Sequence, residues 1–326
     1  MKEGNLMNDI FETIRNSGIL PVVAIEKLEY AVPLAKACVE AGLGGLEITF
    51  RTDCAADAIR AIRKAYPDLK IGAGTILSCA LAKTAIEAGA DFLVTPGFNP
   101  KVVAYALEKK IPITPGVTTP AEVEAAMEMG LSVLKFFPAE MSGGPAKLKI
   151  MEGPYKNIRF IPTGGIDEGN FREYLALPNV LAVGGSFMIN KKAMAAGDMD
   201  SVKAELDRIV DVMLNMKLTH VGINHTDEEK AFSTAKTLER AFHMPYIVGK
   251  SSIFSGTKEL ELMKKQGRGE MGHISIGVTD IDRGIRFLKN RGVGVIEDSL
   301  VVKNGKKIAV YLEQEIGGFA FHLIKY

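Results

Sequence analysis

Apolar and polar positions form two alternating patterns along residues 1–216. Short runs rich in β-branched residues alternate with longer stretches in which apolar residues recur at helical spacing. The short runs lack a polar residue at every second position, which is typical of strands buried on both faces of a parallel sheet. They predict eight strands, at residues 19–25, 44–50, 70–76, 91–95, 111–115, 132–137, 159–164 and 180–185.

The stretches between these runs predict helices, and several of them end in glycine, as helix C-termini often do. Eight strand–helix units predict an α/β fold, a (β/α)8 TIM barrel, over residues 1–216. A doubly wound open sheet is the alternative arrangement of the same units.

The pattern changes near Lys217, where a long helical stretch over 191–216 gives way to a strand. We therefore predict two domains, 1–216 and 217–326, and the length of 326 residues agrees with a prior of roughly 150 residues per domain. The second domain should be a smaller α+β fold.

The second domain contains an internal repeat. The runs THVGINHTDEE (219–229) and GHISIGVTDID (272–282) align at a fixed offset, which places His220 on His273. Each run predicts a strand followed by a helix with an aspartate or threonine near its N-cap.

Further strands follow each run and end in KELELMKK (258–265) and GFAFHLIKY (318–326). Glu261 and His322 then occupy equivalent places in the two copies. The sequence thus predicts a duplicated βαβββ unit.

Composition excludes several classes of protein. With 47% hydrophobic and 24% charged residues the chain is neither disordered nor collagen-like, and its net charge of +1 gives no indication of a nucleic-acid partner. Three cysteines without a C-x-x-C pair argue against a secreted disulfide framework. All five histidines lie after residue 219, so any chemistry of the first domain proceeds without histidine.

The sequence predicts a cytoplasmic protein with no membrane partner. Residues 1–18 contain acidic side chains among apolar ones, which indicates an amphipathic helix and not a signal peptide. The longest uncharged stretch, 174–190, is interrupted by Pro178 and Gly184, so it cannot form the apolar helix of roughly 20 residues that spans a bilayer.

Polar residues gather where the predicted barrel strands end, which is where active sites of this fold lie. They come from separate segments of the chain and are Glu47, Arg51, Thr75, Lys135, Thr163 and Ser186.

Lys135 and Glu47 are charged residues inside apolar strands. An unpaired ammonium is costly to bury, and a neutral amine is a nucleophile that forms a Schiff base with a carbonyl carbon. A carboxyl group at the same barrel mouth can transfer protons to and from such an adduct. The alternatives are a lysine whose ammonium reaches solvent and a purely structural ion pair between Glu47 and Lys135 or Arg51.

Three further features indicate anion binding. Arg51 offers a bidentate fork to a carboxylate, although it can equally be a solvated arginine at a helix start. The Gly-Gly pairs in PTGGI (162–166) and VGGS (183–186) follow the last two strands, where barrels often bind phosphate through backbone N–H groups. Tight turns use the same residues.

The motifs LEITFRT, GAGT, VTPGF, KFFPAE, PTGGI and VGGS, in this order and spacing, resemble the 2-keto-3-deoxy-6-phosphogluconate (KDPG) aldolase family, which overlaps 4-hydroxy-2-oxoglutarate (KHG) aldolase. The resemblance covers about residues 10–212. It implies a class I aldolase on a (β/α)8 barrel, without a cofactor, which acts on small 2-keto acids and forms a homotrimer.

The resemblance also implies a role for each matching residue. Lys135 would form the Schiff base and Glu47 would be the general acid and base. The substrate contacts would be Arg51 and Thr75 at the pyruvate carboxylate, Thr163 at the new hydroxyl, and Gly164, Gly165 and Ser186 at the distal phosphate or carboxylate.

Residues 217–326 resemble the vicinal oxygen chelate superfamily, which includes glyoxalase and bleomycin-resistance proteins. The positions that match its metal ligands are His220, Glu261, His273 and His322, which implies a divalent metal. The last position is commonly glutamate, so a glyoxalase-type activity is in doubt. A metal-free binding fold is the alternative.

Two other functions compete with the aldolase. The barrel can belong to a phosphate-sugar epimerase or isomerase, although the missing histidines and the buried Lys135 count against this. The whole protein can instead be a metabolite sensor that binds its ligand in the second domain and uses the barrel as a scaffold.

Overall fold

The computed structural model describes residues 3–326. The chain divides into two compact units, Met1–Val210 (unit 1) and Asp211–Tyr326 (unit 2). The division falls inside helix α10 (Met199–Leu214), a few residues before the boundary proposed from the sequence. The helix predicted over 1–18 is α1 (Glu3–Ser17), and Met1 and Lys2 lie outside the described residues.

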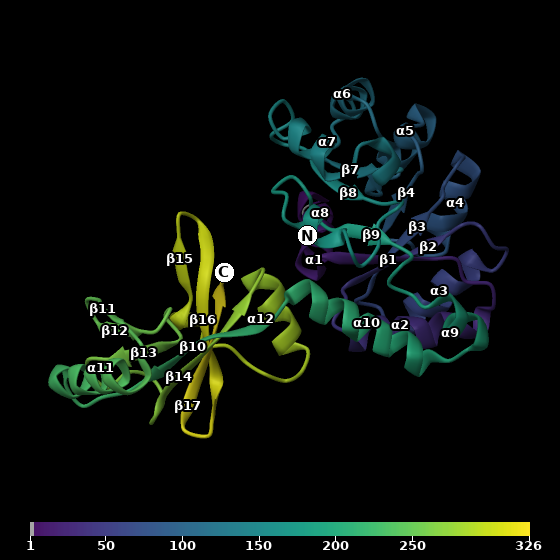
Figure 1. The fold of residues 1–326 in the computed structure, drawn as a ribbon. Helices are drawn as coiled ribbons and strands as arrows, with labels where there is room; N and C mark the ends of the chain where they lie inside the picture. Colours follow the sequence, from purple (N-terminus) through teal and green to yellow (C-terminus); the bar gives the residue numbers. More distant parts are fainter. Residues whose placement is uncertain (1–2) are drawn as a thin grey trace. The chain divides into compact units, whose positions relative to one another are not determined.

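Unit 1 alternates strands and helices along the chain (Figure 1). Every paired strand in it is parallel to its neighbours among the described residues. The strands are β1 (Ile19–Val23), β2 (Gly45–Thr49), β3 (Lys70–Gly74), β4 (Phe92–Val94), β5 (Ile113–Thr114), β6 (Gly116–Val117), β7 (Val133–Phe136), β8 (Arg159–Pro162) and β9 (Val183–Gly185).

Each predicted strand of this unit overlaps an observed one. The fifth is divided into β5 and β6 by Pro115, which has no N–H group to donate to a strand ladder. The ladders run in the orders β5-β4-β3-β2-β1-β9 and β6-β7-β8. A parallel bridge also joins Phe160 of β8 to Val180, just before β9.

Helices connect these strands and bury their apolar faces. In α3 (Ala55–Ala65), for example, Ala58, Ile59 and Ile62 are inaccessible to solvent at helical spacing. The other helical segments are η1 (Leu28–Tyr30), α2 (Ala31–Glu40), α4 (Cys79–Glu87), α5 (Pro100–Glu108), α6 (Pro120–Glu128), η2 (Glu140–Ser142), α7 (Gly144–Met151), α8 (Phe171–Leu175) and α9 (Lys191–Ala196). Unit 1 therefore has the predicted α/β class, with a curled parallel sheet.

Unit 2 is rich in sheet and consists of two passages of chain, each with one strand, one helix and three further strands in that order. The first passage comprises β10 (Lys217–Ile223), α11 (Glu228–Phe242), β11 (Tyr246–Val248), β12 (Ser252–Ser255) and β13 (Leu260–Met263). The second comprises β14 (Gly272–Val278), α12 (Ile281–Lys289), η3 (Glu297–Ser299), β15 (Val301–Lys303), β16 (Lys306–Ile316) and β17 (Phe319–Lys325). Asp227 and Asp280 cap the two helices, as expected from the repeat.

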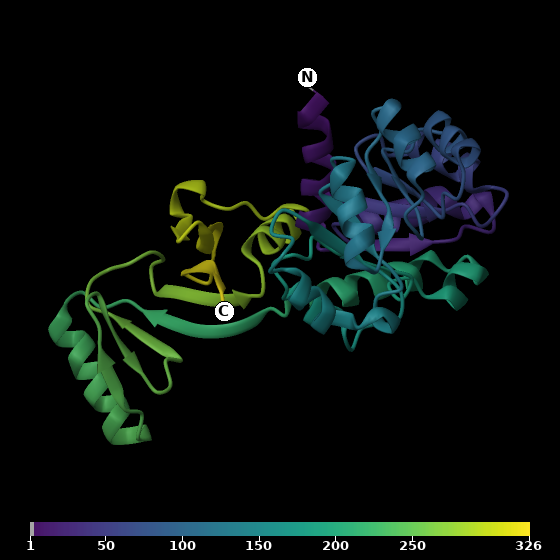
Figure 2. The same cartoon turned by 90° about the horizontal axis from the view of Figure 1, so that it is seen from above.

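The strands of unit 2 form one sheet in the order β11-β12-β13-β10-β14-β17-β16-β15. Helix α11 lies along β12 and β13 (Figure 2). The two passages meet at the antiparallel pair β10 and β14, and β13 and β17 flank that pair in parallel. The four strands that carry the predicted metal ligands are therefore neighbours. No helix in the described part of the chain is long and apolar enough to cross a membrane.

Candidate functional site

The lysine and the glutamate predicted from the barrel strands lie together. Lys135 is in β7 and Glu47 in β2, and Nζ of the lysine is 3.6 Å from Oε1 of the glutamate. Only 7% of Lys135 and 2% of Glu47 is exposed. Two opposite charges are therefore held almost out of water, where each depends on the other for its stability.

Two residues that the sequence argument did not assign shape the surroundings of this pair. A Cβ atom on Gly74 would lie 2.1 Å from Oε1 of Glu47, so the glycine of β3 leaves the space that the carboxylate occupies. The centre of the Phe137 ring lies 5.3 Å from Nζ of Lys135. The GAGT and KFFPAE motifs contain both residues. The contact of Gly74 depends on the register between β2 and β3, which the motif does not show, whereas Phe137 lies two residues after Lys135 on the same segment.

Arg51 and Thr75 also lie together, just beyond the ends of β2 and β3. Nε of Arg51 donates a hydrogen bond of 3.1 Å to Oγ1 of Thr75. Thr75 has φ +60°, a conformation that is strained for a β-branched residue and that clusters at functional sites. The contact brings a guanidinium group and a hydroxyl group together at the edge where the strands end.

Thr163 follows β8, and its Oγ1 is buried without a hydrogen-bond partner among the described residues. A Cβ on Gly184 would approach that oxygen to 2.6 Å, so β9 leaves room for it. Gly164 and Gly165 continue the chain with φ of 99° and 78°, which glycine adopts without strain. Ser186 follows β9 and lines a cavity of about 300 Å³.

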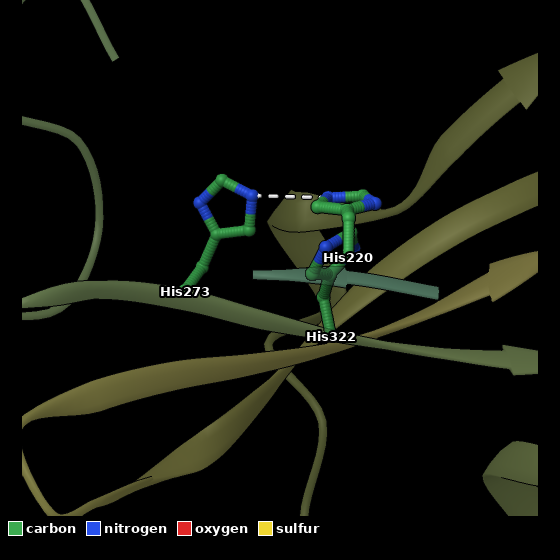
Figure 3. A group of neighbouring side chains, drawn as sticks. All are labelled: His220, His273 and His322. Atoms are coloured by element: carbon green, nitrogen blue, oxygen red, sulfur yellow. Dashed lines mark hydrogen bonds between the residues drawn. The ribbon is translucent and has the colours of Figure 1, made fainter. Parts of the chain in front are cut away.

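A second group of side chains lies in unit 2. His220, His273 and His322 come from β10, β14 and β17 and turn their rings toward one another (Figure 3). Nε2 of His220 and Nε2 of His273 are 3.1 Å apart. Oε2 of Glu261, on β13, lies 3.2 Å from Nε2 of His273 and 3.4 Å from Nε2 of His220. The four predicted ligand positions thus converge.

His322 is 7% exposed, and neither of its ring nitrogens has a hydrogen-bond partner among the described residues. One nitrogen from each of the three histidines lies within 4.8 Å of the others. The ring of Tyr311 stacks on His322 with 4.9 Å between centroids. Buried polar atoms usually have a hydrogen-bond partner, so both ring nitrogens of His322 are available to a further group.

Electrostatics in this group favour neutral imidazoles at His220 and His322. Burial lowers the pKa of His220, and burial together with the neighbouring His273 and His220 lowers the pKa of His322 to about 4. Burial alone would raise the pKa of Glu261, but hydrogen bonds from His273 and Ser252 outweigh it and hold that pKa below its usual value. The imidazoles of three histidines and one carboxylate form a donor set that suits Zn²⁺ and similar divalent ions.

Unit 1 holds a buried lysine late in β7 next to a buried carboxylate in the middle of β2, an arrangement suited to Schiff-base chemistry. A family model for KDPG and KHG aldolase matches residues 10–205. The chain belongs to this family. The matched region lies within unit 1.

Curated relatives agree with this assignment. The 2-dehydro-3-deoxy-phosphogluconate aldolase of Treponema pallidum is 49% identical over 198 residues, which cover 61% of this chain and 94% of the relative. The KHG/KDPG aldolase of Escherichia coli is 46% identical over 192 residues, which cover 59% of this chain and 90% of the relative.

Solved structures give the same result. The KDPG aldolase of Legionella pneumophila, with pyruvate captured as a covalent carbinolamine intermediate, superposes with a TM-score of 0.60 at 34% identity. The match covers 62% of this chain and 97% of that protein.

We expect the metal-free protein to lose stability in unit 2 as the pH falls from about 6.5 toward 4. His322 binds a proton near pH 6.5 in the unfolded chain but only near pH 4 in the folded unit, so acid favours unfolding. Calorimetric unfolding of unit 2 at pH 7 and pH 5, with chelator present, measures this loss.

The variant His322→Gln should show a smaller drop in the midpoint temperature of unfolding of unit 2 over the same pH range. A residual drop is expected from His220, whose pKa is also lowered. A wild-type midpoint that stays constant or rises on acidification would contradict the account.

Proposed function

We propose that the chain is a class I aldolase that cleaves KDPG to pyruvate and glyceraldehyde 3-phosphate, and/or KHG to pyruvate and glyoxylate. The observation that carries the proposal is the buried pair of Lys135 on β7 and Glu47 on β2. Relatives that are 40–49% identical and bear the names of these aldolases support it.

We further propose that the sheet of unit 1 closes into a full (β/α)8 barrel. Four strand spacings separate β2 from β7 if β5 and β6 are counted as one strand. In a flat sheet this would place the two strands roughly 19 Å apart. The contact of 3.6 Å between their side chains requires strong curvature, and the bridge from Phe160 to Val180 supports closure.

The reaction begins at Lys135. Its amine attacks the C2 ketone of the substrate, and loss of water gives a protonated imine. The amine must be neutral to attack, and Glu47 lies where it can accept the proton. Both groups are buried in an apolar site, where two charges are costly. Transfer of the proton from the lysine to the glutamate removes both charges.

Glu47 returns its proton to the carbinolamine hydroxyl, which leaves as water. As a carboxylate again, Glu47 then takes the proton of the C4 hydroxyl, directly or through a water molecule. The C3–C4 bond breaks and its electron pair moves into the imine, which leaves an enamine of pyruvate and an aldehyde. Protonation of the enamine at C3 and hydrolysis of the imine release pyruvate and regenerate Lys135. No cofactor is required, because the imine itself accepts the electrons.

The remaining residues are proposed to bind substrate. Arg51 and Thr75 would hold the pyruvate carboxylate, since a guanidinium group and a hydroxyl group both donate to it. The unpartnered hydroxyl of Thr163 would contact the C4 oxygen. Gly164, Gly165 and Ser186 would hold the distal anion.

We also propose a homotrimer in the cytoplasm, as the resemblance to the family implies. Met141 and Ile150, on η2 and α7, expose 88% and 77% of their surface. Apolar side chains this exposed often belong to interfaces between subunits, which supports assembly.

For unit 2 we propose a fold of the vicinal oxygen chelate superfamily that binds a divalent metal through His220, Glu261, His273 and His322. The unpaired nitrogens of His322 and the convergence of the four side chains support the metal. The bound ion would act as a Lewis acid toward an oxygen ligand.

Borohydride reduction in the presence of pyruvate tests the nucleophile. We expect one covalent adduct, located at Lys135 by peptide mass spectrometry, because reduction fixes the imine. Lys135→Met should carry no adduct and lose cleavage activity by at least about 10³-fold. Lys149→Met, an exposed lysine on α7, is the matched control. An active protein without an adduct at Lys135 would contradict the proposal.

The substitution Gly74→Ala tests the position of Glu47. The new methyl group would overlap Oε1 of Glu47 and displace the carboxylate, so we expect kcat/KM to fall by about 10²-fold. In Gly153→Ala the new methyl group would make only an ordinary contact at 3.7 Å, so kcat/KM should change less than twofold. Equal activity of the two folded variants, measured as pyruvate release, would contradict the role of Glu47.

Metal binding to unit 2 is tested by titrating the chelator-treated full chain with Co²⁺ and following its absorption bands. We expect one ion per chain, and an affinity about 10- to 100-fold weaker in His322→Gln, which removes one donor. His243→Gln, at the exposed end of α11, should bind as the wild type does. Equal affinities of the two variants would contradict the site.

A further inference from the structure

A hydrogen bond between Tyr174 and Glu140 links helix α8 to the short helix η2. The hydroxyl of Tyr174, on α8, donates to Oε1 of Glu140, the first residue of η2. Tyr174 is inaccessible to solvent, whereas Glu140 is exposed. Burial and the hydrogen bond to Glu140 raise the pKa of Tyr174, so its phenol stays protonated and able to donate. A buried hydroxyl without a partner is costly, so this contact holds the Glu140 carboxylate against α8.

Glu140 in turn contacts the loop after β8 through both its backbone and its side chain. Its N–H donates a hydrogen bond of 3.1 Å to the carbonyl of Gly164. A Cβ atom on Gly165 would lie 2.7 Å from Cβ of Glu140, so this glycine lets the loop pack directly on the glutamate side chain. The N–H of Ala139, just before η2, donates over 2.9 Å to the carbonyl of Thr163. Residues 163–165 are therefore held against the start of η2.

The backbone of Thr163 is also tied to the strand that carries the proposed nucleophile. Its N–H donates a hydrogen bond of 2.9 Å to the carbonyl of Phe136, which follows Lys135 in β7. The N–H of Thr163 is thus bonded to β7 and its carbonyl to Ala139, while its Oγ1 has no partner among the described residues. These backbone contacts set where Oγ1 lies relative to Lys135, and the contacts on the η2 side depend on the hydrogen bond from Tyr174.

We propose that Tyr174 and Glu140 are positioning residues for the aldol cleavage, and that they fix the hydroxyl of Thr163 where it distinguishes KDPG from its epimer at C4. The inference rests on the proposed function, in which Thr163 contacts the C4 oxygen. The two epimers differ only in the direction of that oxygen, so a hydroxyl held in one place favours one of them. A misplacement of about 1 Å can cost about 10²-fold in rate, which is why the loop needs a firm support.

The substitution Tyr174→Phe in the full chain tests the pair, because it removes the hydroxyl and keeps the ring. We expect kcat/KM for KDPG to fall by about tenfold, and the preference for KDPG over its C4 epimer to fall by about fivefold. Glu140→Leu removes the acceptor and should give the same losses. Glu140→Gln keeps an oxygen acceptor and should change both quantities by less than about twofold. Pyruvate release from each epimer measures the kcat/KM values.

Unit 1 offers a matched control in a second tyrosine–glutamate pair. The hydroxyl of Tyr155, which is also buried, donates over 2.9 Å to the exposed Glu124. Tyr155 precedes β8 in the chain, whereas Thr163 follows that strand, so Tyr155→Phe should leave the preference between the epimers unchanged. A general loss of stability would affect both tyrosine variants. The double variant Tyr174→Phe/Glu140→Leu should lose no more than either single variant, because each of them already lacks the contact.

Three results would overturn the inference: equal cleavage of the two epimers by the wild type, an unchanged preference in Tyr174→Phe, and an equal change in Tyr155→Phe. Borohydride trapping of pyruvate on Lys135 separates this inference from the proposed function, because pyruvate has no C4 atom. We expect Tyr174→Phe to be trapped as the wild type is. If the wild type forms no adduct and cleaves neither epimer, the proposed aldolase function fails. Normal trapping with an unchanged preference refutes the positioning role alone.

Discussion

The ion pair of Lys135 and Glu47 is the constraint on which the rest of unit 1 depends. Both side chains are almost fully buried, and removing either would leave an isolated charge in an apolar surrounding, at a cost of about 3–5 kcal/mol. Their strands are far apart in the order of the sheet, so the contact forms only if the sheet curls. The curvature of the sheet and the chemistry proposed for the site are thus linked through one contact.

In unit 2 the internal repeat brings the polar groups together. Its two passages meet at β10 and β14, and the equivalent strands β13 and β17 flank them. Side chains at equivalent positions of the repeat therefore converge on one place, as His220 and His273 do. Ser252, on β12, donates to Oε1 of Glu261 and leaves Oε2 facing the imidazoles.

Much of this could be predicted from the sequence, because strand patterns and charges in apolar runs are local signals. The eight strands, the repeat, Lys135 and Glu47 were found in this way, whereas the three histidines and Glu261 of unit 2 followed from the resemblance to the vicinal oxygen chelate superfamily. The role of Gly74 was not found, because it depends on which residues face each other across strands.

The exchange of the methyl protons of pyruvate with deuterium oxide, followed by NMR, tests the central claim most directly. Exchange requires an imine at Lys135 and a base that removes the C3 proton. The account predicts exchange in the wild type and none in Lys135→Met. Glu47→Gln should still form the borohydride-trapped adduct but exchange at least about 10²-fold more slowly. Wild-type exchange rates in either variant would contradict the account.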